Sequence, residues 1–120
     1  LIKSKGEMTE INETVAIQFF EGKNEKSHPE IRLFRDLDGK KGKAVFKFYT
    51  STTITLKNFK SIQKMYLIDK EGQLLTKKID LSFSRNHIKE VKSTYSWKSE
   101  KEFERFMRFS KRYANSFLNN

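Results

Sequence analysis

Three arginines near the C-terminus have the spacing best suited to binding chemistry. Arg105, Arg108 and Arg112 follow one another at intervals of three and four residues, which on an α-helix places them on one face. Arginine can bind a carboxylate or a phosphate through two parallel hydrogen bonds. Phe109 lies toward these arginines, and a partly exposed aromatic beside arginines is typical of a binding hot spot. We therefore predict a partner-binding face of Arg105, Arg108, Phe109 and Arg112, with simple solvation of the basic face as the alternative.

Residue combinations typical of enzymes are scarce. The chain has no cysteine and only two histidines, His28 and His87, which fall in expected turns with no nucleophile motif beside them. This excludes thiol chemistry and leaves no spacing that suggests a zinc site. Gly39 and Gly42 match neither a Walker loop nor a dinucleotide-binding fingerprint. We predict a protein that is not an enzyme and that holds no cofactor and no metal.

Residues 41–48, with the sequence K-G-K-A-V-F-K-F, partly match an RNA-recognition strand. In such strands, exposed aromatic side chains stack on bases. Here the stacking positions carry Lys43 and Val45, whereas Phe46 and Phe48 are expected to face the core. The net charge of +10 fits anionic partners in general. A basic RNA- or nucleic-acid-binding module therefore remains the alternative function.

Extended segments are predicted throughout the middle of the chain. Turn signatures occur at residues 36–42 (D-L-D-G-K-K-G), 69–72 (D-K-E-G) and 85–87 (R-N-H). Residues 50–61 are rich in threonine and lysine and have no clear assignment. The spacing of the turns predicts an antiparallel meander. Its extended runs are residues 15–20, 31–35, 43–49, 62–69, 74–83 and 88–97.

A helix is predicted from about Ser99 to Phe117. Ser99 and Glu102 fit a capping box, in which the hydroxyl accepts a backbone hydrogen bond and the carboxylate reaches back to the N-cap. An apolar stripe at helical spacing is expected to pack on the sheet. Its members are Phe103, Phe106, Met107, Tyr113, Ala114 and Phe117. The predicted fold class is α+β, an antiparallel, meander-like β-sheet with a C-terminal amphipathic helix packed on it.

The length of 120 residues suits one compact domain. Residues 1–14 are polar and show little periodicity. We therefore predict a flexible N-terminal extension over residues 1–14, followed by a single domain over residues 15–120. No apolar run in the sequence approaches the ~20 residues that span a bilayer.

Two segments of the chain resemble a known family. They are residues 65–72 (M-Y-L-I-D-K-E-G) and residues 104–114 (E-R-F-M-R-F-S-K-R-Y-A). Shorter pieces support them in the same order, such as I-Q-F at residues 17–19 and I-R-L at residues 31–33. Over residues 16–114 the chain resembles the Psb28 family of photosystem II assembly proteins, called PsbW in algae. The resemblance implies a soluble, cofactor-free assembly factor that binds photosystem II assembly intermediates transiently.

The resemblance also implies partners and a location. The expected partners are reaction-centre and inner-antenna subunits of photosystem II in assembly intermediates, with no nucleic acid. The expected location is peripheral to the thylakoid membrane, on the stromal side in a plastid (chloroplast) or the cytoplasmic side in a cyanobacterium. In this family a reaction-centre loop is thought to extend the protein's sheet by β-augmentation. Residues 115–120 end early and lack the glycine usual in family tails, and the chain is more basic than many relatives.

Overall fold

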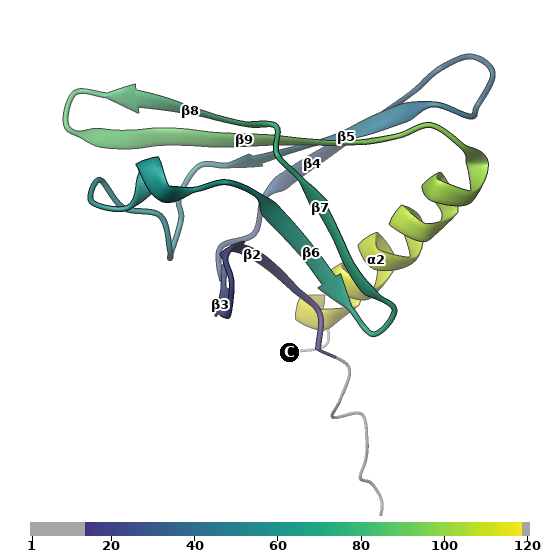
Figure 1. Ribbon diagram of the computed structural model, residues 1–120, viewed down its shortest axis with the longest axis horizontal. Helices are drawn as coiled ribbons and strands as arrows, with labels where there is room; N and C mark the ends of the chain where they lie inside the picture. Colours follow the sequence, from purple (N-terminus) through teal and green to yellow (C-terminus); the bar gives the residue numbers. More distant parts are fainter. Residues whose placement is uncertain (1–13, 119–120) are drawn as a thin grey trace, which may run out of the picture.

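Two four-stranded antiparallel sheets and one long helix form the described part of the chain (Figure 1). The computed structural model describes residues 14–118, so the predicted N-terminal extension lies outside it except for Thr14. One sheet has the strand order β3-β2-β6-β7 and the other the order β4-β5-β9-β8. The elements are β2 (Ala16–Phe20), β3 (Lys23–Asn24), β4 (Glu30–Arg35), β5 (Gly42–Phe48), η2 (Phe59–Ser61), β6 (Met65–Asp69), β7 (Gly72–Thr76), β8 (Ile79–Ser84), β9 (His87–Trp97) and α2 (Glu100–Leu118).

The predicted α+β class with a C-terminal helix is confirmed, but the strands form two sheets instead of one meander. The alternation over residues 74–83 predicts one strand, whereas the structure has β7 and β8 there, in different sheets. The chain passes from one sheet to the other between β7 and β8, and two hydrogen bonds with Thr94 of β9 fix this crossing. The Thr76 hydroxyl donates to the Thr94 carbonyl at 2.6 Å, and the Thr94 N–H donates to the Lys78 carbonyl at 3.0 Å. Because the period-two pattern is the same for one long strand and for two in series, the alternation does not reveal the crossing.

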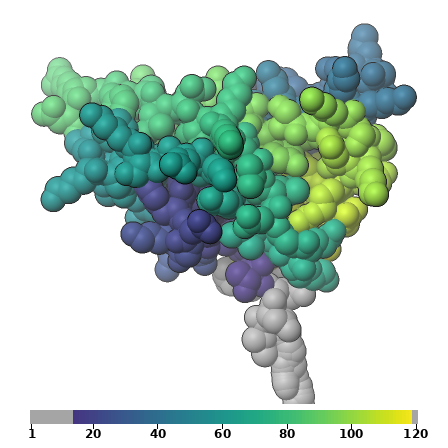
Figure 2. Space-filling model, viewed as in Figure 1, coloured from purple at the N-terminus to yellow at the C-terminus, as the bar shows by residue number. Residues whose placement is uncertain are grey.

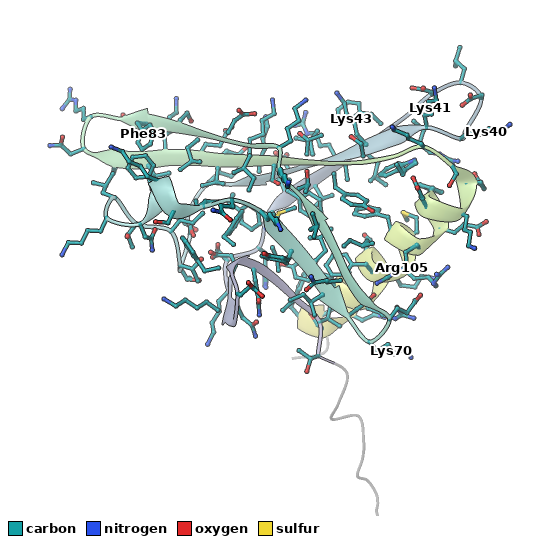
Figure 3. The ribbon with its side chains drawn as sticks, viewed as in Figure 1. Lys40, Lys41, Lys43, Lys70, Phe83 and Arg105 are labelled. Atoms are coloured by element: carbon teal, nitrogen blue, oxygen red, sulfur yellow. The ribbon has the colours of Figure 1, made fainter. Side chains whose placement is uncertain are left out.

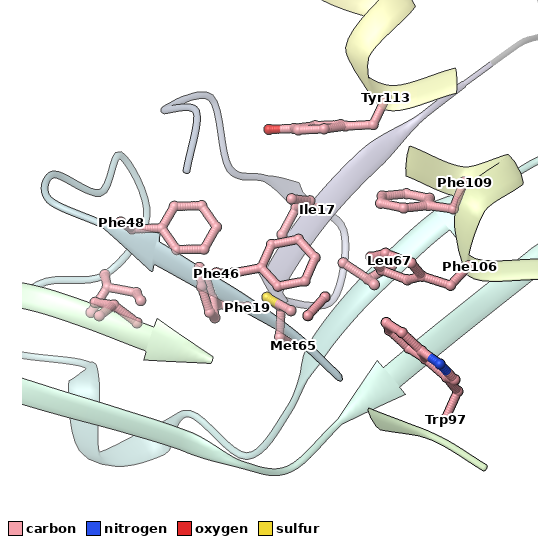
Figure 4. Close-up of a cluster of buried hydrophobic side chains, with 13 residues drawn as sticks. Ile17, Phe19, Phe46, Phe48, Met65, Leu67, Trp97, Phe106, Phe109 and Tyr113 are labelled. Carbon is pink, nitrogen blue, oxygen red and sulfur yellow. The ribbon is translucent and has the colours of Figure 1, made fainter. Parts of the chain in front are cut away.

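The core lies between the inner faces of the two sheets, and helix α2 closes it (Figure 4). Phe106, Phe109 and Tyr113 project from the helix toward the sheets, and Phe106 stacks on Trp97 of β9 with ring centroids 5.4 Å apart. Fully burying a side chain of this size contributes about 1.5–3 kcal/mol, so the apolar helix face is a major source of stability. The strands add the core residues Ile17, Phe19, Ala44, Phe46, Phe48, Met65, Leu67 and Val91.

Helix α2 begins where the sequence predicts it, directly after Ser99. The Ser99 hydroxyl accepts a hydrogen bond from the N–H of Glu102 at 3.1 Å, and the Glu102 carboxylate accepts one from the N–H of Lys98 at 2.7 Å. The capping box is therefore present, with its return contact one residue earlier than expected. Within residues 14–118, no helix is long and apolar enough to cross a membrane.

A buried carboxylate, Glu25, organises residues 50–61, which have no clear assignment from sequence. Glu25 is only 5% exposed. It accepts hydrogen bonds from the hydroxyls of Ser51 at 2.6 Å and Thr53 at 2.7 Å, and from the Thr52 N–H at 2.7 Å. Burial by itself raises the pKa of Glu25, but the hydroxyl and amide donors around it stabilise the charged form and lower the pKa to about 2. The loop after β5 is thus tied to the segment after β3.

Candidate docking site

The β6–β7 hairpin brings two carboxylates to the arginines of helix α2. Asp69 and Gly72 form the last pair of the ladder, so a two-residue turn joins the strands. Gly72 adopts a φ of 123°, a conformation that glycine tolerates far better than other residues. An Asp69 carboxylate oxygen accepts the Glu71 N–H at 3.0 Å and steadies the turn. The turn predicted at residues 69–72 is confirmed, and it places both acidic side chains beside the helix.

Asp69 is the buried centre of this network. Its side chain has 0% exposure, and Arg105 binds it through two hydrogen bonds, Nη2 to Oδ1 at 2.7 Å and Nη1 to Oδ2 at 2.9 Å. Nη1 of Arg112 donates to Oδ2 at 2.9 Å. Burial by itself raises the pKa of Asp69, but the two guanidinium groups outweigh it, and the pKa is lowered. Asp69 therefore stays charged and links the hairpin to the helix.

Glu71 lies closer to solvent and shares the arginines. Arg108 binds it through two hydrogen bonds, Nε to Oε2 at 2.8 Å and Nη2 to Oε1 at 2.9 Å, and Arg112 Nη1 donates to Oε2 at 2.5 Å. The hydrogen bonds from Arg108 and Arg112 lower the pKa of Glu71 to about 2. Because three arginines surround two carboxylates, the network keeps an excess of one positive charge.

The three arginines differ in how far a partner can reach them. The exposed fraction of the side chain is 16% for Arg105, 23% for Arg112 and 49% for Arg108. Arg105 and Arg112 both hold the buried Asp69 carboxylate, whereas Arg108 binds the more exposed Glu71. Arg108 is therefore the member of the predicted face that is best placed to meet a partner.

The predicted exposure of Phe109 is wrong. Its side chain has 0% exposure, and its ring centroid lies 6.4 Å from that of Phe106 and 5.7 Å from that of Tyr113. Phe109 comes three residues after Phe106 and four before Tyr113, so at the helical repeat it belongs to the apolar stripe. Phe103 and Met107 lie partly buried at the edge of that stripe. Phe109 is thus a core residue and does not present its ring to a partner.

A hollow of about 380 Å³ separates the arginine face from strand β7. Figure 1 shows β7 running beside α2, and Figure 3 shows Arg105 on the helix near the hairpin. Burial, and to a lesser extent Glu102, raises the pKa of Tyr95 in this hollow, so its hydroxyl stays protonated and can donate a hydrogen bond. The lining suits a segment with both apolar and acidic side chains. It consists of Leu74, Tyr95, Lys101, Glu102, Arg105 and Arg108.

Strand β7 is the edge of its sheet beside this hollow. In an antiparallel ladder, hydrogen-bonded and non-hydrogen-bonded pairs alternate, and the pair that closes a two-residue turn is hydrogen-bonded. Counted from the turn, Gln73 and Leu75 stand in non-hydrogen-bonded pairs with β6. Their N–H and C=O groups therefore point away from β6, where an added strand could bind them.

The two segments that carry the family resemblance meet at this site. Residues 65–72 supply Asp69 and Glu71, and residues 104–114 supply the three arginines. Sequence reasoning named the arginines but assigned the two acidic residues only to a turn. Their negative charge complements the positive charge of the three arginines, and this is the one feature of the sequence that indicates the pairing. The lining residues contributed by β7 and β9 had no such signal, and the structure alone identifies them.

The aromatic residues considered for RNA binding and one of the two histidines pack within the fold. Phe46 and Phe48 are 0% and 1% exposed, so their predicted core position is confirmed and they offer no stacking platform for RNA. His28 stacks on Phe117 with ring centroids 4.0 Å apart. Among residues 14–118, no group of three or more His, Cys, Asp and Glu side chains is arranged to hold a metal ion.

Known proteins are similar to this chain over most of its length. Residues 17–118 match the sequence model of the Psb28 protein family. A Photosystem II reaction center Psb28 protein from Prochlorococcus marinus strain NATL2A is 72% identical over 113 residues, which cover 94% of this chain and 100% of that protein. Proteins of the same name are 46% identical in P. marinus strain MIT 9211, covering 82% of this chain and 85% of that protein, and 43% identical in Synechococcus sp. strain CC9605, covering 84% and 80%.

Proposed function

Because the chain belongs to the Psb28 protein family, we propose that it binds photosystem II assembly intermediates transiently, on the stromal or cytoplasmic side of the thylakoid membrane. The relatives are named photosystem II reaction center proteins, which supports photosystem II as the partner. Family membership also agrees with the expectation that the chain is not an enzyme. The relatives come from Prochlorococcus and Synechococcus, which favours the cytoplasmic side of a cyanobacterial thylakoid over a plastid stroma.

The family match over residues 17–118 carries this proposal, and the hollow between β7 and α2 supplies its docking site. An extended loop of a reaction-centre or inner-antenna subunit adds a strand to β7 through the backbone of Gln73 and Leu75. Its apolar side chains enter the hollow against Leu74 and Tyr95. An acidic side chain of the loop binds Arg108, attracted by the excess positive charge of the arginine network.

Arg105 and Arg112 serve this function as positioning residues. They bind the buried carboxylate of Asp69 and thereby keep the hairpin against the helix. Reversing the charge of Arg112 would place a third acid beside Asp69 and Glu71 and would disturb folding together with docking. Variants of Arg108 and of the β7 edge therefore separate docking from folding.

Capture from thylakoid membranes tests the partner and the arginine face. Tagged protein is expected to recover assembly intermediates that contain the inner antenna. Arg108→Gln should recover about tenfold less, because the exposed charged anchor is lost. Lys111→Gln is the matched control, since it removes one exposed positive charge from the same helix. Recovery of RNA in place of photosystem subunits would refute the proposed partner, and equal recovery by Arg108→Gln would refute the arginine contact.

A second variant tests the strand edge. Leu75→Pro removes an N–H that points away from β6, so pairing within the sheet can persist while an added strand loses a donor. Leu75→Val keeps that N–H and serves as the control. The proline variant should lose capture and the valine variant should retain it, with far-ultraviolet circular dichroism confirming that both are folded. Full capture by a folded Leu75→Pro protein would assign docking to another edge.

A further inference from the structure

The outer face of the β4-β5-β9-β8 sheet carries cations that the proposed docking site does not use. Strand register brings them together, since Arg32 lies opposite Val45 and Lys47 lies opposite Lys92. Strand alternation turns these side chains away from the core, which the neighbouring Phe46 enters. They surround a hollow of about 250 Å³, whose lining is Arg32, Phe34, Lys43, Val45, Lys47 and Lys92.

The lysines of this face differ in their neighbours: Lys47 lies opposite Glu30 and Lys92 opposite Asp80 in the ladders, whereas Lys43 lies opposite Phe34. Arg32 pairs with Glu30 at 3.3 Å, but Lys43, Lys47 and Lys92 form no ion pair within residues 14–118. Lys47 and Lys92 also lie directly opposite each other in the ladder. Like charges in that position repel and destabilise a sheet. Glu30 and Asp80 offset part of this repulsion from the flanking strands, which leaves Lys43 and the lysines of the hairpin turn as the cations available to an anionic surface.

The β4–β5 hairpin adds an apolar tip to the cationic face. Leu37 is fully exposed and Phe34 is 48% exposed. Figure 2 shows the hairpin, in blue, projecting beyond the body of the molecule, and Figure 3 shows Lys40, Lys41 and Lys43 along the same edge of the view. Phe34 and Leu37 are two of the eight large hydrophobic side chains that are exposed within residues 14–118, and Phe34 lies opposite Lys43 in the ladder. Two exposed apolar side chains thus lie beside the lysines of the hairpin.

The acidic residues of the hairpin do not cancel its positive charge. Asp36 and Asp38 lie at the tip, and hydrogen bonding to the Lys40 N–H lowers the pKa of Asp38, which stays charged. Against these two and Glu30 stand six cations within residues 30–48, and on the adjoining strands Lys92 is balanced by Asp80 opposite it. The six are Arg32, Arg35, Lys40, Lys41, Lys43 and Lys47.

We propose that this face docks on a membrane surface that contains anionic phospholipid. The lysines contact the headgroup phosphates, and Leu37 and Phe34 enter the interface between headgroups and acyl chains. Lysine is a compact charge on a flexible stem, which suits a fluid and diffuse anionic surface, whereas the arginine forks at α2 suit directed pairing with carboxylates. Lysines around exposed apolar side chains are the composition of proteins that bind at membrane interfaces.

This membrane face is separate from the proposed photosystem docking site. In Figure 3, Lys43 lies at the β4-β5-β9-β8 sheet, whereas Arg105 lies at the helix and Lys70 at the β6–β7 hairpin. One molecule could therefore touch a bilayer and a photosystem subunit at the same time. The inference does not rest on the proposed function, and vesicles without photosystem subunits test it independently.

Sedimentation with vesicles provides the test. The protein should bind vesicles of phosphatidylglycerol mixed with phosphatidylcholine, should not bind vesicles of phosphatidylcholine alone, and should be released by added salt. Lys43→Gln with Lys47→Gln should weaken binding about 25-fold, because each basic residue near an anionic surface contributes about fivefold. Lys57→Gln with Lys60→Gln removes the same charge from η2 and the turn before it and should bind like the wild type. Leu37→Ser should weaken binding about tenfold by removing the apolar tip.

Several results would overturn the proposal. Equal binding to neutral and anionic vesicles would show that charge plays no part in binding. Equal losses from the two lysine pairs would show that binding depends on the net charge of the protein and not on this face. Absence of vesicle binding together with tight binding of single-stranded RNA through Lys43 and Lys47 would assign the face to nucleic acid. Each of these results would leave the capture of photosystem II intermediates as it is, so failures of the two proposals are distinguishable.

Discussion

Two carboxylate centres hold distant parts of this chain together, and they differ in the groups that surround the charge. Glu25 is enclosed by neutral hydroxyl and amide donors from Ser51, Thr52 and Thr53. Asp69 is enclosed by the guanidinium groups of helix α2. Both carboxylates are buried, and the pKa of each is lowered. A buried carboxylate can therefore be stabilised by neutral donors or by cations with the same effect on its ionisation.

The difference lies in what each centre can do beyond folding. The donors around Glu25 are directed inward to its carboxylate, and the resulting site anchors a loop. The arginine network has more positive than negative charge and reaches solvent at Arg108. It can therefore stabilise the fold at Asp69 and still attract an acidic partner. The neutral donors fit a structural anchor, whereas the half-exposed Arg108 and the excess positive charge fit the proposed contact with an acidic partner.

Removing the Glu25 carboxylate should have the largest effect on stability. In Glu25→Ala, the donors of Ser51, Thr52 and Thr53 lose their acceptor in a nearly closed site, which should cost about 3–4 kcal/mol of the free energy of unfolding. Urea denaturation measures this loss, and hydrogen exchange at the Thr52 and Thr53 amides shows whether the loop is released. Glu21→Ala, at an exposed turn, is the control. A loss as small as that of the control would mean that Glu25 does not anchor the loop.

Asp69→Asn should have a smaller but salt-dependent effect. The amide cannot neutralise Arg105 and Arg112, so the loss should be about 2 kcal/mol in dilute buffer. High salt should reduce the loss, because salt screens the remaining charges, whereas the loss in Glu25→Ala should hardly change with salt. Urea denaturation in low and high salt measures both, with Asp80→Asn as an exposed control. If salt changed the loss of stability equally in the two variants, the neutral donors of Glu25 and the charged donors of Asp69 would not differ in this respect.

Acid should weaken both centres over one pH range. The pKa of Glu25 and that of Glu71 are lowered from 4.5 to about 2, and the pKa of Asp69 is also lowered. Carboxyls with a lowered folded-state pKa contribute stability that is fully present above the unfolded-state pKa and is lost as the pH falls toward the folded-state value. Urea denaturation should therefore show stability falling from about pH 4.5 to about pH 2.

Two variants separate the contributions of Glu25 and Asp69 to this loss of stability in acid. Glu25→Gln should make the fall in stability shallower at any salt concentration. Asp69→Asn should make it shallower mainly in dilute buffer, because its partners are charged. A wild-type protein whose stability did not change between these pH limits would show that neither carboxylate is stabilised by folding.

Arg108→Gln should have the smallest effect on folding. Its side chain is half-exposed, and ion pairs at the surface contribute little to stability. The urea midpoint should stay close to that of the wild type and of Lys111→Gln, although capture of photosystem II intermediates falls. A loss of stability comparable to that of Asp69→Asn would make Arg108 part of the anchor and not of the recognition surface.

Local sequence patterns predicted much of the fold. The capping residues and the apolar period located α2, and the turn signatures located the β6–β7 and β8–β9 turns. These features depend on residues within a few positions of one another, so they can be read without the rest of the chain. The spacing of Phe109 to Phe106 and Tyr113 also predicts its burial, because the helical repeat places all three side chains on one face, whereas its position beside the arginines suggests exposure.

The sequence by itself determined the arginine series, the helix that presents it and the family to which the chain belongs. Only the tertiary structure decided that the strands divide into two sheets, that Glu25 anchors the loop after β5, and that Asp69 and Glu71 bind the arginines. The two carboxylate sites depend on residues more than twenty positions apart. The division into sheets depends on a crossing between β7 and β8 at which the alternation of side chains does not change. Their pairing is set by how whole elements pack, which no local pattern encodes.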